Sequence, residues 1–434
     1  MDKMADVLGR AGAWCGQNKY LSAIKNAFQN FMPLTIAGAI GVLWCNVLVN
    51  DQTGLGLFFK PIMALDFLNP AFQAVNFCTI SCITVGITLG IAQEIGVWNM
   101  GAERAGYIPG LVGLAAWLSV TNTSHMVDGA KEAFTGIAGN ELGATGLFTG
   151  MIIGVLSVEL FCFFEKQDAL KIKMPEQVPP GVARAFEVLV PATLTLIITA
   201  CIGSAYYNLT GLYLNDVIKN GIQGPLGAVG ATIPGVMIIY LVIMLFWLVG
   251  IHGNNMLSAV KEALFTPLAL ENVEKFNKGE KPTNIINMYA LQMWGEFGGS
   301  GVTIGLVIAI MIFGKREDNK AIATLSLVPG LFNINETVTF GIPMVLNPIL
   351  GIPFVVAPLI TIIIGYVLTV IGFCPVACLT VPWTTPPIVF GFLACGANVM
   401  GAVTQAILIV VSTVIYVPFL ISYEKYQNKQ AAEA

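Results

Sequence analysis

Charged side chains are scarce in this chain of 434 residues. Only 11% of the residues are Asp, Glu, Lys or Arg, whereas 56% are hydrophobic. A soluble globular domain would carry about 25% charged residues. The sequence also has no basic patch and no nucleic-acid-binding motif, so nucleic acid is not an expected partner. This shortage of charge excludes an ordinary soluble fold and indicates a protein of the lipid bilayer.

Several other signatures are missing. The sequence contains no P-loop, no serine-protease arrangement and no zinc signature. Its nine cysteines are scattered, and the helical spacing of Cys78 with Cys82 and of Cys374 with Cys378 is typical of reduced packing residues. Residues 1–30 lack the apolar core and cleavage site of a signal peptide. We expect no metal and no cofactor, so any chemistry must come from a carboxylate, a histidine and neutral hydrogen-bonding groups.

Long apolar runs dominate the chain. A transmembrane helix needs about 20 apolar residues. Runs of about this length lie near 31–50, 74–96, 105–121, 146–164, 186–207, 228–251, 300–314, 352–373 and 398–421. A chain of this length has room for about ten spans plus loops. We therefore expect an all-α polytopic membrane protein with about ten transmembrane helices.

The two halves of the chain differ in how cleanly spans can be recognised. Residues 1–210 contain about five clean spans and are expected to form a scaffold domain. Within 211–434, the segments 285–300, 321–348 and 374–397 are moderately apolar but interrupted by Gly, Pro, Asn or Gln. Interrupted hydrophobic segments point to a transporter binding site. We expect re-entrant hairpins among these segments and a transport domain with about five further spans.

Basic residues cluster in four places that predict the orientation in the membrane. The clusters are Lys3, Arg10, Lys19 and Lys25; Lys166, Lys171, Lys173 and Arg184; Lys315, Arg316 and Lys320; and Lys425 and Lys429. Such clusters favour the cytoplasmic side. Both termini are then predicted to be cytoplasmic, which requires an even number of crossings.

Glu336 is the most isolated charge in the sequence. No other Asp, Glu, Lys, Arg or His occurs between Ala321 and Tyr423. A carboxylate in apolar surroundings is costly and usually has a partner or a function. Asn333 and Asn335 bring hydrogen-bonding groups next to it, and nearby Gly and Pro break any straight helix. Broken backbone at membrane depth is tolerated where it lines a wet cavity, so the pattern predicts a polar ligand site.

His252 is the second candidate. It ends a long apolar run and is flanked by Gly250 and Gly253, with Asn254 and Asn255 following. Taken alone, it fits an interfacial histidine bonded to backbone equally well. The glycines and the paired amides favour a site. Histidine titrates near neutrality, so it can take up a proton or stabilise a phosphoryl group.

The Gly298-Gly-Ser-Gly301 turn is a weaker candidate. It opens a predicted helix and can present the backbone N–H groups of Gly299 and Ser300 to an anion. Close packing of helices through small residues explains the same pattern at least as well.

Four further residues are candidates for binding a ligand with many hydroxyl groups. Trp247, Trp294 and Trp383 can stack on a sugar ring, although each alone fits an interfacial aromatic belt better. Trp383 is the strongest because it lies in the Pro-rich stretch 382–387. Asn140 lies between predicted spans and also fits a plain turn.

Lys261 and Glu262 follow His252 by two to three helical turns. We interpret them as a solvated face rather than as catalytic groups. The remaining set of amides, one carboxylate and aromatic rings suits a carbohydrate.

Several motifs in order along the chain carry a resemblance. They are Gly250-Ile-His-Gly253, Gly298-Gly-Ser-Gly301, Ile334-Asn-Glu336, Phe340-Gly-Ile-Pro-Met-Val-Leu-Asn-Pro348 and Pro382-Trp-Thr384, together with Met174-Pro-Glu-Gln-Val-Pro-Pro180. The chain resembles the membrane subunit EIIC of the bacterial phosphotransferase system, lactose/cellobiose family, over nearly its full length. It looks most like the cellobiose and diacetylchitobiose branch.

The resemblance implies a homodimer in the bacterial cytoplasmic membrane, with the first half forming the dimer contact. The second half would carry a disaccharide, held between two hairpins, by a rigid-body motion. A separate EIIB subunit, supplied by EIIA and the general phosphotransferase proteins, would donate phosphate from a phosphocysteine. Glu336 matches the family's essential glutamate and His252 the histidine near the phosphate-transfer position. Asn140 and Trp383 match less firmly.

The resemblance also implies that the attacking group is a sugar hydroxyl, by analogy the 6-hydroxyl. Glu336 would accept a hydrogen bond from it and can take its proton. His252 would either stabilise the phosphoryl charge when protonated or act as the base when neutral, and the sequence leaves both assignments open. The alternative function is an ion-coupled secondary sugar transporter in which Glu336 and His252 relay protons. A third class is a channel or a purely structural membrane protein.

Overall fold

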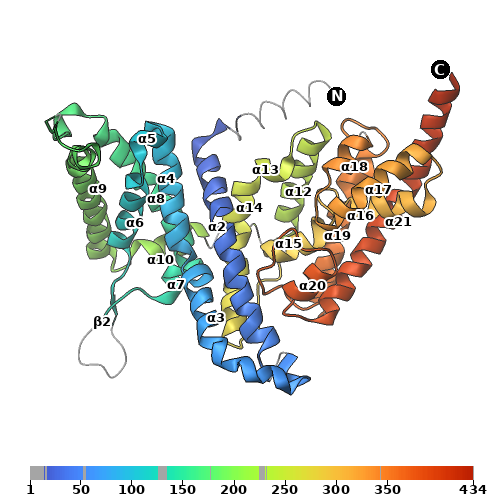
Figure 1. Cartoon of the computed structure of the whole chain (residues 1–434), viewed down its shortest axis with the longest axis horizontal. Coiled ribbons are helices and arrows are strands. Elements are labelled where there is room, and N and C mark those ends of the chain that lie inside the picture. Colours follow the sequence, from blue (N-terminus) through green and yellow to red (C-terminus); the bar gives the residue numbers. More distant parts are fainter. Residues whose placement is uncertain are drawn as a thin grey trace. The chain divides into compact units, whose positions relative to one another are not determined.

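The computed structural model describes residues 14, 17–51, 55–125, 134–175, 177–223, 230, 232–342 and 344–433. The described residues are almost entirely helical (Figure 1). They divide into two compact units. The N-terminal unit contains Gln17–Gly38 and Val75–Gly227, and the C-terminal unit contains Ala39–Ala74 and Ala228–Ala434. Each unit is described separately below.

The elements up to residue 223 are mostly long helices with one short hairpin of strands. The α-helices are α2 (Lys19–Leu43), α3 (Asn69–Asn76), α4 (Ile83–Met100), α5 (Ala102–Ala105), α6 (Ile108–Val120), α7 (Gly139–Leu142), α8 (Ala144–Glu165), α9 (Pro180–Thr210) and α10 (Leu214–Ile218). Short 3-10 or π turns are η1 (Trp44–Leu48), η2 (Leu55–Leu57), η3 (Lys60–Leu68), η4 (Phe77–Ser81), η5 (Asp168–Leu170) and η6 (Lys219–Gln223). Strands β1 (Ser124–His125) and β2 (Phe134–Thr135) pair antiparallel.

The elements after residue 231 alternate between long and short helices. They are α12 (Ile233–Leu248), α13 (Gly253–Met256), α14 (Ser258–Asn277), α15 (Met288–Gly295), α16 (Ile304–Phe313), α17 (Glu317–Leu331), α18 (Glu336–Gly341), α19 (Gly351–Val370), α20 (Val389–Ala394) and α21 (Val399–Glu433). Every apolar run recognised in the sequence overlaps one of the helices of the two units, which confirms those predictions of helix.

The length of the helices supports a membrane protein. Among the described residues, five helices are long and apolar enough to cross a membrane: Lys19–Leu48, Ala144–Glu165, Pro180–Thr210, Gly351–Val370 and Val399–Glu433. The pair Lys60–Ser81 and Ile83–Met100 passes the same test but is bent by 42°. The helices Ile108–Val120, Ile233–Leu248 and Ile304–Phe313 are apolar but shorter. The predicted number of ten crossings stays a prediction.

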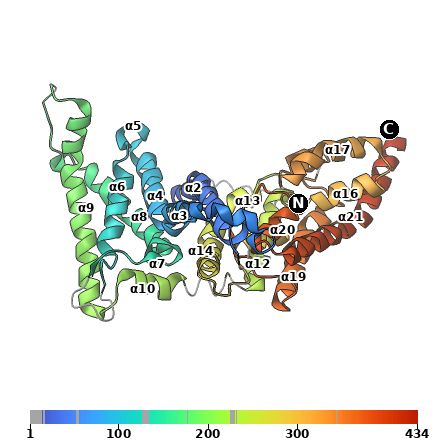
Figure 2. The same ribbon diagram turned by 60° about the horizontal axis from the view of Figure 1, so that its bottom comes forward.

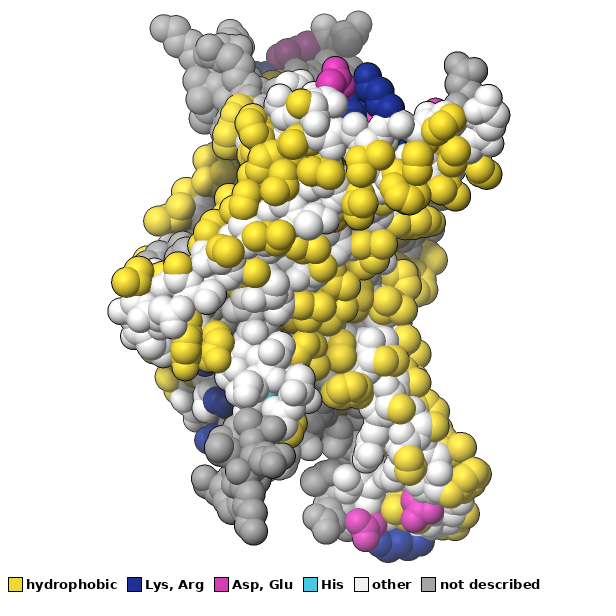
Figure 3. Space-filling view, turned by 90° about the vertical axis from the view of Figure 1, so that its left-hand side faces the viewer, with side chains coloured by type: hydrophobic (Ala, Val, Ile, Leu, Met, Phe, Trp, Pro, Cys, Tyr) yellow, Lys and Arg dark blue, Asp and Glu magenta, His cyan; other side chains and the backbone are white. Residues whose placement is uncertain are grey.

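The surface has the pattern expected of a protein in lipid. Figure 3 shows one face on which hydrophobic side chains cover the middle, while charged side chains gather towards its upper and lower ends. The long helix α9 contributes exposed apolar residues such as Leu189, Ile197 and Ile202, which are 48%, 54% and 58% exposed. Apolar side chains can face outward over such a length because lipid tails, unlike water, do not penalise them.

In the N-terminal unit, α4, α6 and α8 pack on one another. Small residues make this close approach possible. A Cβ atom on Gly113 of α6 would lie 2.3 Å from the Cβ of Ala92 on α4, so only glycine fits there. Packing through small residues is the usual way for membrane helices to gain contact area, since burial of apolar surface gives no advantage over lipid.

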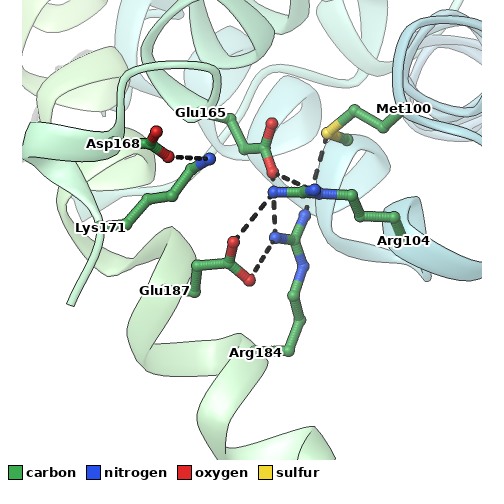
Figure 4. Close-up of polar contacts among 7 residues, drawn as sticks. All are labelled: Met100, Arg104, Glu165, Asp168, Lys171, Arg184 and Glu187. Atoms are coloured by element: carbon green, nitrogen blue, oxygen red, sulfur yellow. Dashed lines mark hydrogen bonds and ion pairs between the residues drawn. The ribbon is translucent and has the colours of Figure 1, made fainter. Parts of the chain in front are cut away.

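A cluster of charged side chains connects three helices at one end of this unit (Figure 4). Glu165, at the end of α8, is 3% exposed and accepts from Arg104 Nε at 2.8 Å and from Arg184 Nη1 at 3.0 Å. Glu187 accepts from the same two guanidinium groups, at 2.9 Å and 2.8 Å. The cluster therefore joins α5, α8 and the first turns of α9. The predicted cytoplasmic loop Met174–Pro180 leads into α9, which begins at Pro180. Residue 176 lies outside the described residues.

In the C-terminal unit, α16 and α19 both pack against α21, and Figures 1 and 2 show the three side by side. The shorter α15 and α20 pack on α19 and α21, respectively. Three of the short helices, α15, α18 and α20, lie in the segments 285–300, 321–348 and 374–397 that were predicted to be interrupted. Their breaks are stabilised by side chains: buried Asn287, for example, accepts from the N–H groups of Tyr289 and Ala290 and so caps α15. These breaks supply the residues of the site.

Candidate functional site

A cavity of about 520 Å³ lies in the C-terminal unit. This volume is in the range of small-molecule sites. Its lining combines amides, carboxylates, a histidine and aromatic rings: His252, Asn254, Asn255, Glu262, Gln292, Glu296, Phe297, Gly299, Ser300, Asn333, Ile334, Asn335, Glu336, Trp383, Phe390 and Gln405. Most of these residues come from turns between helices, where the backbone N–H and C=O groups are not used in helical hydrogen bonds.

His252 and Glu336 face each other at this cavity. The distance between His252 Nε2 and Glu336 Oε1 is 3.8 Å, and their side chains are 36% and 48% exposed. His252 is the N-cap of α13, and its Nδ1 accepts from the N–H of Asn255 at 3.3 Å. A ring nitrogen that accepts carries no proton, so the neutral ring holds its proton on Nε2. The tautomer thus points a donor towards the carboxylate of Glu336.

Trp247 supports the imidazole from behind. The two ring centroids lie 4.4 Å apart, and the indole also contacts Phe354 edge-on at 6.4 Å. Trp247 is only 2% exposed. It therefore limits the orientations of His252 without touching the cavity itself.

The glycine-rich turn between α15 and α16 forms a second wall. Gly298, Gly299 and Gly301 have φ values of +73°, +88° and +79°, a region that residues with a Cβ atom rarely occupy. A Cβ atom on Gly299 would lie 2.7 Å from the Cβ of Asn335. Without it, Asn335 comes close enough for its Nδ2 to donate to the carbonyl of Ser300 at 2.7 Å. The turn and the segment that carries Glu336 are locked together in this way.

Asn333 connects this turn to a third segment. Its Oδ1 accepts from the N–H of Gly298 at 2.6 Å, and its Nδ2 donates to the carbonyls of Trp383 and Thr385. One amide therefore binds backbone groups of two segments. These groups, the N–H of Gly298 and the carbonyls of Trp383 and Thr385, have no partner within a helix. It brings Trp383, which is 44% exposed, to the cavity.

A buried ion pair lies beside the cavity. Lys261 on α14 pairs with Glu296, and their side chains are 7% and 16% exposed. The hydroxyl of Tyr240 donates to the same carboxylate oxygen at 2.7 Å. The interpretation of Lys261 and Glu262 as a solvated face is wrong. Lys261 is buried because Glu296 supplies its counter-charge, and Glu262 lines the cavity, accepting from Thr266 at 2.5 Å.

The structure brings together seven of the residues predicted for the site. They are His252, Asn254, Gly299, Ser300, Asn335, Glu336 and Trp383. Trp247 and Trp294 do not line the cavity: both are at most 2% exposed, and Trp294 packs against Gly365. Neither can stack on a ligand in this structure. Asn140 belongs to α7 of the N-terminal unit, and its side chain lies outside the described residues.

Several lining residues were not predicted. Glu296 is one that the sequence could have revealed, since no other Asp, Glu, Lys, Arg or His lies between Lys281 and Lys315. Gln405 is another: this 1% exposed amide accepts from the N–H groups of Ile388 and Gly391 and so fixes the start of α20. Asn333 was noted only as a neighbour of Glu336.

The cavity offers both donors and acceptors to a polar, largely uncharged ligand. Gln292 Oε1 is buried, and no described residue donates to it. Within the described residues, no three His, Cys, Asp or Glu side chains are placed to hold a metal ion. The arrangement suits binding of hydroxyl groups, with a carboxylate and an imidazole as the acid–base pair.

Comparison with known proteins agrees with this geometry. Residues 25–358 match the family "Phosphotransferase system, EIIC". The chain is 32% identical to the oligo-beta-mannoside-specific EIIC component of Bacillus subtilis (strain 168), covering 98% of this chain and 94% of that one. It is 30% identical to the cellobiose-specific EIIC component of Lactococcus lactis, covering 98% of each. It is 31% identical to the lactose-specific EIICB component of Streptococcus mutans, covering 96% of this chain and 71% of that one.

A solved structure shows the same fold. The transporter ChbC, the IIC component of the N,N'-diacetylchitobiose-specific phosphotransferase system, superposes with a TM-score of 0.88. The two sequences are 29% identical, and the alignment covers 97% of each chain. The resemblance seen in the sequence is confirmed. The chain belongs to the phosphotransferase system EIIC family.

Proposed function

We propose that this protein is a permease that carries a disaccharide of the cellobiose, diacetylchitobiose or lactose type across the bacterial cytoplasmic membrane. Transport would be coupled to phosphorylation of the sugar by the phosphocysteine of an EIIB partner. The relatives named for cellobiose and lactose support the substrate class, and the lactose EIICB components support the EIIB partner. The chain would act as the transport component of a phosphotransferase complex.

The pair of His252 and Glu336 is the observation that carries this proposal. Phosphoryl transfer depends mainly on positioning and on stabilising charge. The sugar hydroxyl, by analogy the 6-hydroxyl, would lie between the two side chains and attack the phosphorus of phosphocysteine. Its proton would pass to Glu336 as the P–S bond breaks and the cysteine leaves as a thiolate.

The tautomer of His252 supports this division of labour. Because Nδ1 accepts a backbone N–H, Nε2 carries the proton and acts as a donor. A donor at this position would stabilise the negative charge on a phosphoryl oxygen. Glu336 has acceptor lone pairs, and no described Lys or Arg lies within ion-pair distance of it, so it is the better base.

Other cavity residues would bind the rest of the disaccharide. Trp383 offers an exposed indole face beside the cavity for stacking on a sugar ring. The amides of Asn254, Asn335 and Gln292 line the same space. Neutral donors and acceptors of this kind match a ligand that carries many hydroxyl groups and no charge.

We further propose ten crossings with re-entrant hairpins in the C-terminal half, both termini in the cytoplasm, and assembly as a homodimer. The long apolar helices, the bent pair and the three shorter apolar helices support a high number of crossings. The short helices α15, α18 and α20, which lie in interrupted segments, support the hairpins. In this scheme residues 1–210 form the scaffold and dimer contact, and residues 211–434 move the sugar.

Uptake into membrane vesicles tests the proposed function. Vesicles that contain this protein are supplied with labelled cellobiose, diacetylchitobiose or lactose, with or without phosphoenolpyruvate and the soluble phosphotransferase proteins. We expect sugar inside to be phosphorylated, and to accumulate only when both additions are present. Accumulation of free sugar without them, abolished by an ionophore, would instead establish ion-coupled transport, and the lack of any saturable uptake would contradict both.

A further inference from the structure

We propose that Lys261 is a positioning residue that fixes the direction of a hydrogen-bond chain through Asn254 to Ser300. This series of hydrogen bonds makes the Ser300 hydroxyl a donor to one oxygen of the sugar. Glu296, the ion-pair partner of Lys261, would accept from a different sugar hydroxyl. This inference rests on the proposed function, because it assigns roles in binding the same sugar.

The argument starts from the burial of Lys261. The residue is 6% exposed, and a buried ammonium group must be paired and hydrogen-bonded. Its Nζ contacts the carboxylate of Glu296 and lies 3.4 Å from Asn254 Oδ1. Lys261 itself does not line the cavity, whereas Asn254 and Glu296 do. Its hydrogen bonds therefore reach a ligand through these two neighbours.

The ammonium group determines which way the amide of Asn254 points. An ammonium group only donates, so it is the oxygen of the amide that faces Lys261. The amide nitrogen then points the other way and donates to Ser300 Oγ at 3.0 Å. With the two ends of the amide fixed in this order, Ser300 Oγ must act as an acceptor towards Asn254.

The consequence appears at Ser300. Its oxygen receives the bond from Asn254, and no described residue accepts its hydroxyl hydrogen. The carbonyl of the same residue is held by Asn335, so the turn cannot rotate freely. Ser300 lines the cavity and is only 4% exposed. A buried hydroxyl with a spare hydrogen will donate to an oxygen of the ligand.

Glu296 presents the opposite polarity. Lys261 and Tyr240 both donate to Oε1 of its carboxylate. Its Oε2 has no partner among the described residues, and the side chain lines the cavity. A carboxylate offers only acceptor lone pairs, so Glu296 selects a hydroxyl group that donates. Lys261 therefore supports one donor and one acceptor at separate points of the cavity wall.

The two roles can be separated with sugar analogues. Replacing a hydroxyl by hydrogen removes both donor and acceptor, whereas replacing it by fluorine removes the donor and leaves a weak acceptor. At the position bound by Ser300, the deoxy sugar should bind at least tenfold more weakly than the parent, and the fluoro sugar should recover part of this loss. At the position bound by Glu296, both analogues should lose affinity equally.

The experiment is calorimetric titration of the purified full chain with the parent disaccharide and its deoxy and fluoro-deoxy series. We expect K261M to remove the difference between deoxy and fluoro analogues at the Ser300 position, because Asn254 is then free to flip. K261R, which still only donates, should restore it. S300A should remove the same difference, and the double variant K261M/S300A should be no worse at that position than S300A alone.

N254D provides a test that does not depend on removing the buried charge. The aspartate keeps the shape and pairs with Lys261, but it accepts from Ser300 instead of donating to it. We expect N254D to reproduce the effect of S300A. K278M, on the exposed end of the same helix, is the matched control and should bind every analogue like the wild type.

A structural role alone would lower the affinity of K261M for all analogues by the same factor and keep the difference at the Ser300 position. That outcome, or additive losses in K261M/S300A, would overturn the inference. Wild-type protein that binds a disaccharide without any such difference would overturn it too, while leaving the proposed function intact. Wild-type protein that binds none of the disaccharides would contradict the proposed function itself.

Discussion

His252 Nε2 lies 3.8 Å from Glu336 Oε1, and the two residues stand at the starts of the short helices α13 and α18. Neither side chain is carried by a long span. The position of each depends on a break in the helical backbone and on the residues that stabilise the break. The variants below test the acid–base pair and its supports separately.

Glu336→Gln should abolish phosphorylation-coupled uptake. The amide keeps the shape of the carboxylate but can neither take the hydroxyl proton nor accept equally strongly. Loss of one such group commonly lowers the rate about 100- to 1000-fold. The measurement is uptake of labelled sugar as its phosphate in vesicles. Glu317→Gln, at an 87% exposed side chain, is the control and should transport normally; wild-type rates in the Glu336 variant would remove this residue from the reaction.

His252→Asn should separate phosphoryl transfer from folding. Asparagine is a good N-cap residue and can accept from the N–H of Asn255 in place of Nδ1, but it has no counterpart of Nε2. We expect sugar affinity within about tenfold of wild type and phosphorylation slower by about 100-fold or more. Titration of sugar binding and a phosphorylation assay with EIIB give the two values. Equal losses in both would indicate a plain ligand role for His252.

Gly299→Ala should destroy the sugar site by a steric clash. The new Cβ atom would lie 2.7 Å from that of Asn335, and φ is +88°. Gly279→Ala is the matched control: its φ is +74°, but nothing lies within 4 Å of the new Cβ atom. Backbone strain affects both variants by about 1 kcal/mol. Loss of binding in Gly299→Ala alone would show that the clash matters, and equal binding in the two variants would contradict it.

Asn333→Asp should weaken sugar binding although it changes a single atom. The carboxylate can still accept from Gly298, but it cannot donate to the carbonyls of Trp383 and Thr385, and it repels them. We expect affinity to fall by about tenfold or more, as for a lost pair of buried hydrogen bonds. In Asn398→Asp, by contrast, the side chain needs only to accept from Met400, so its affinity should be unchanged. Calorimetric titration compares the two variants.

Glu165→Gln should lower the thermal stability of the N-terminal unit. The carboxylate is buried and neutralises two guanidinium groups (Figure 4). Removing one partner of a buried ion pair leaves uncompensated charge, which costs up to about 3 kcal/mol where the other partners are partly exposed. The measurement is the temperature at which half the protein stays monodisperse in detergent. Glu103→Gln changes an exposed carboxylate on α5 and should leave that temperature unchanged.

The membrane class and the helices were predictable because both depend on local composition. A run such as 146–164 must be helical in lipid, since only a helix satisfies its own backbone there, and α8 follows it closely. The absence of other charged residues around Glu336 is also a property of local composition, so the sequence identified this residue too. The same reasoning applied to Glu296 would have found it, but the segment 285–300 was interpreted through its interruptions, its glycine-rich turn and Trp294.

The failures share one cause. Lys261 was interpreted as solvated because it lies beside Glu262 in the charged stretch 253–284, and the carboxylate that neutralises it lies on a distant segment. All three tryptophans were candidates for stacking on a sugar ring. Trp383, the strongest of them, lines the cavity, but Trp247 and Trp294 are packed inside. Which side of a helix or turn is buried depends on contacts between segments, and composition does not encode those contacts.

The sequence alone determined that this is a helical membrane protein of the EIIC family, with a lone glutamate and a lone histidine in broken segments. These conclusions follow from local hydrophobicity and from motif order. Only the tertiary structure decided that His252 meets Glu336, that Asn333 holds three segments together, and that Lys261 and Glu296 form a buried pair. The reason is physical: hydrogen bonds and ion pairs depend on distances of a few ångströms between residues far apart in the chain.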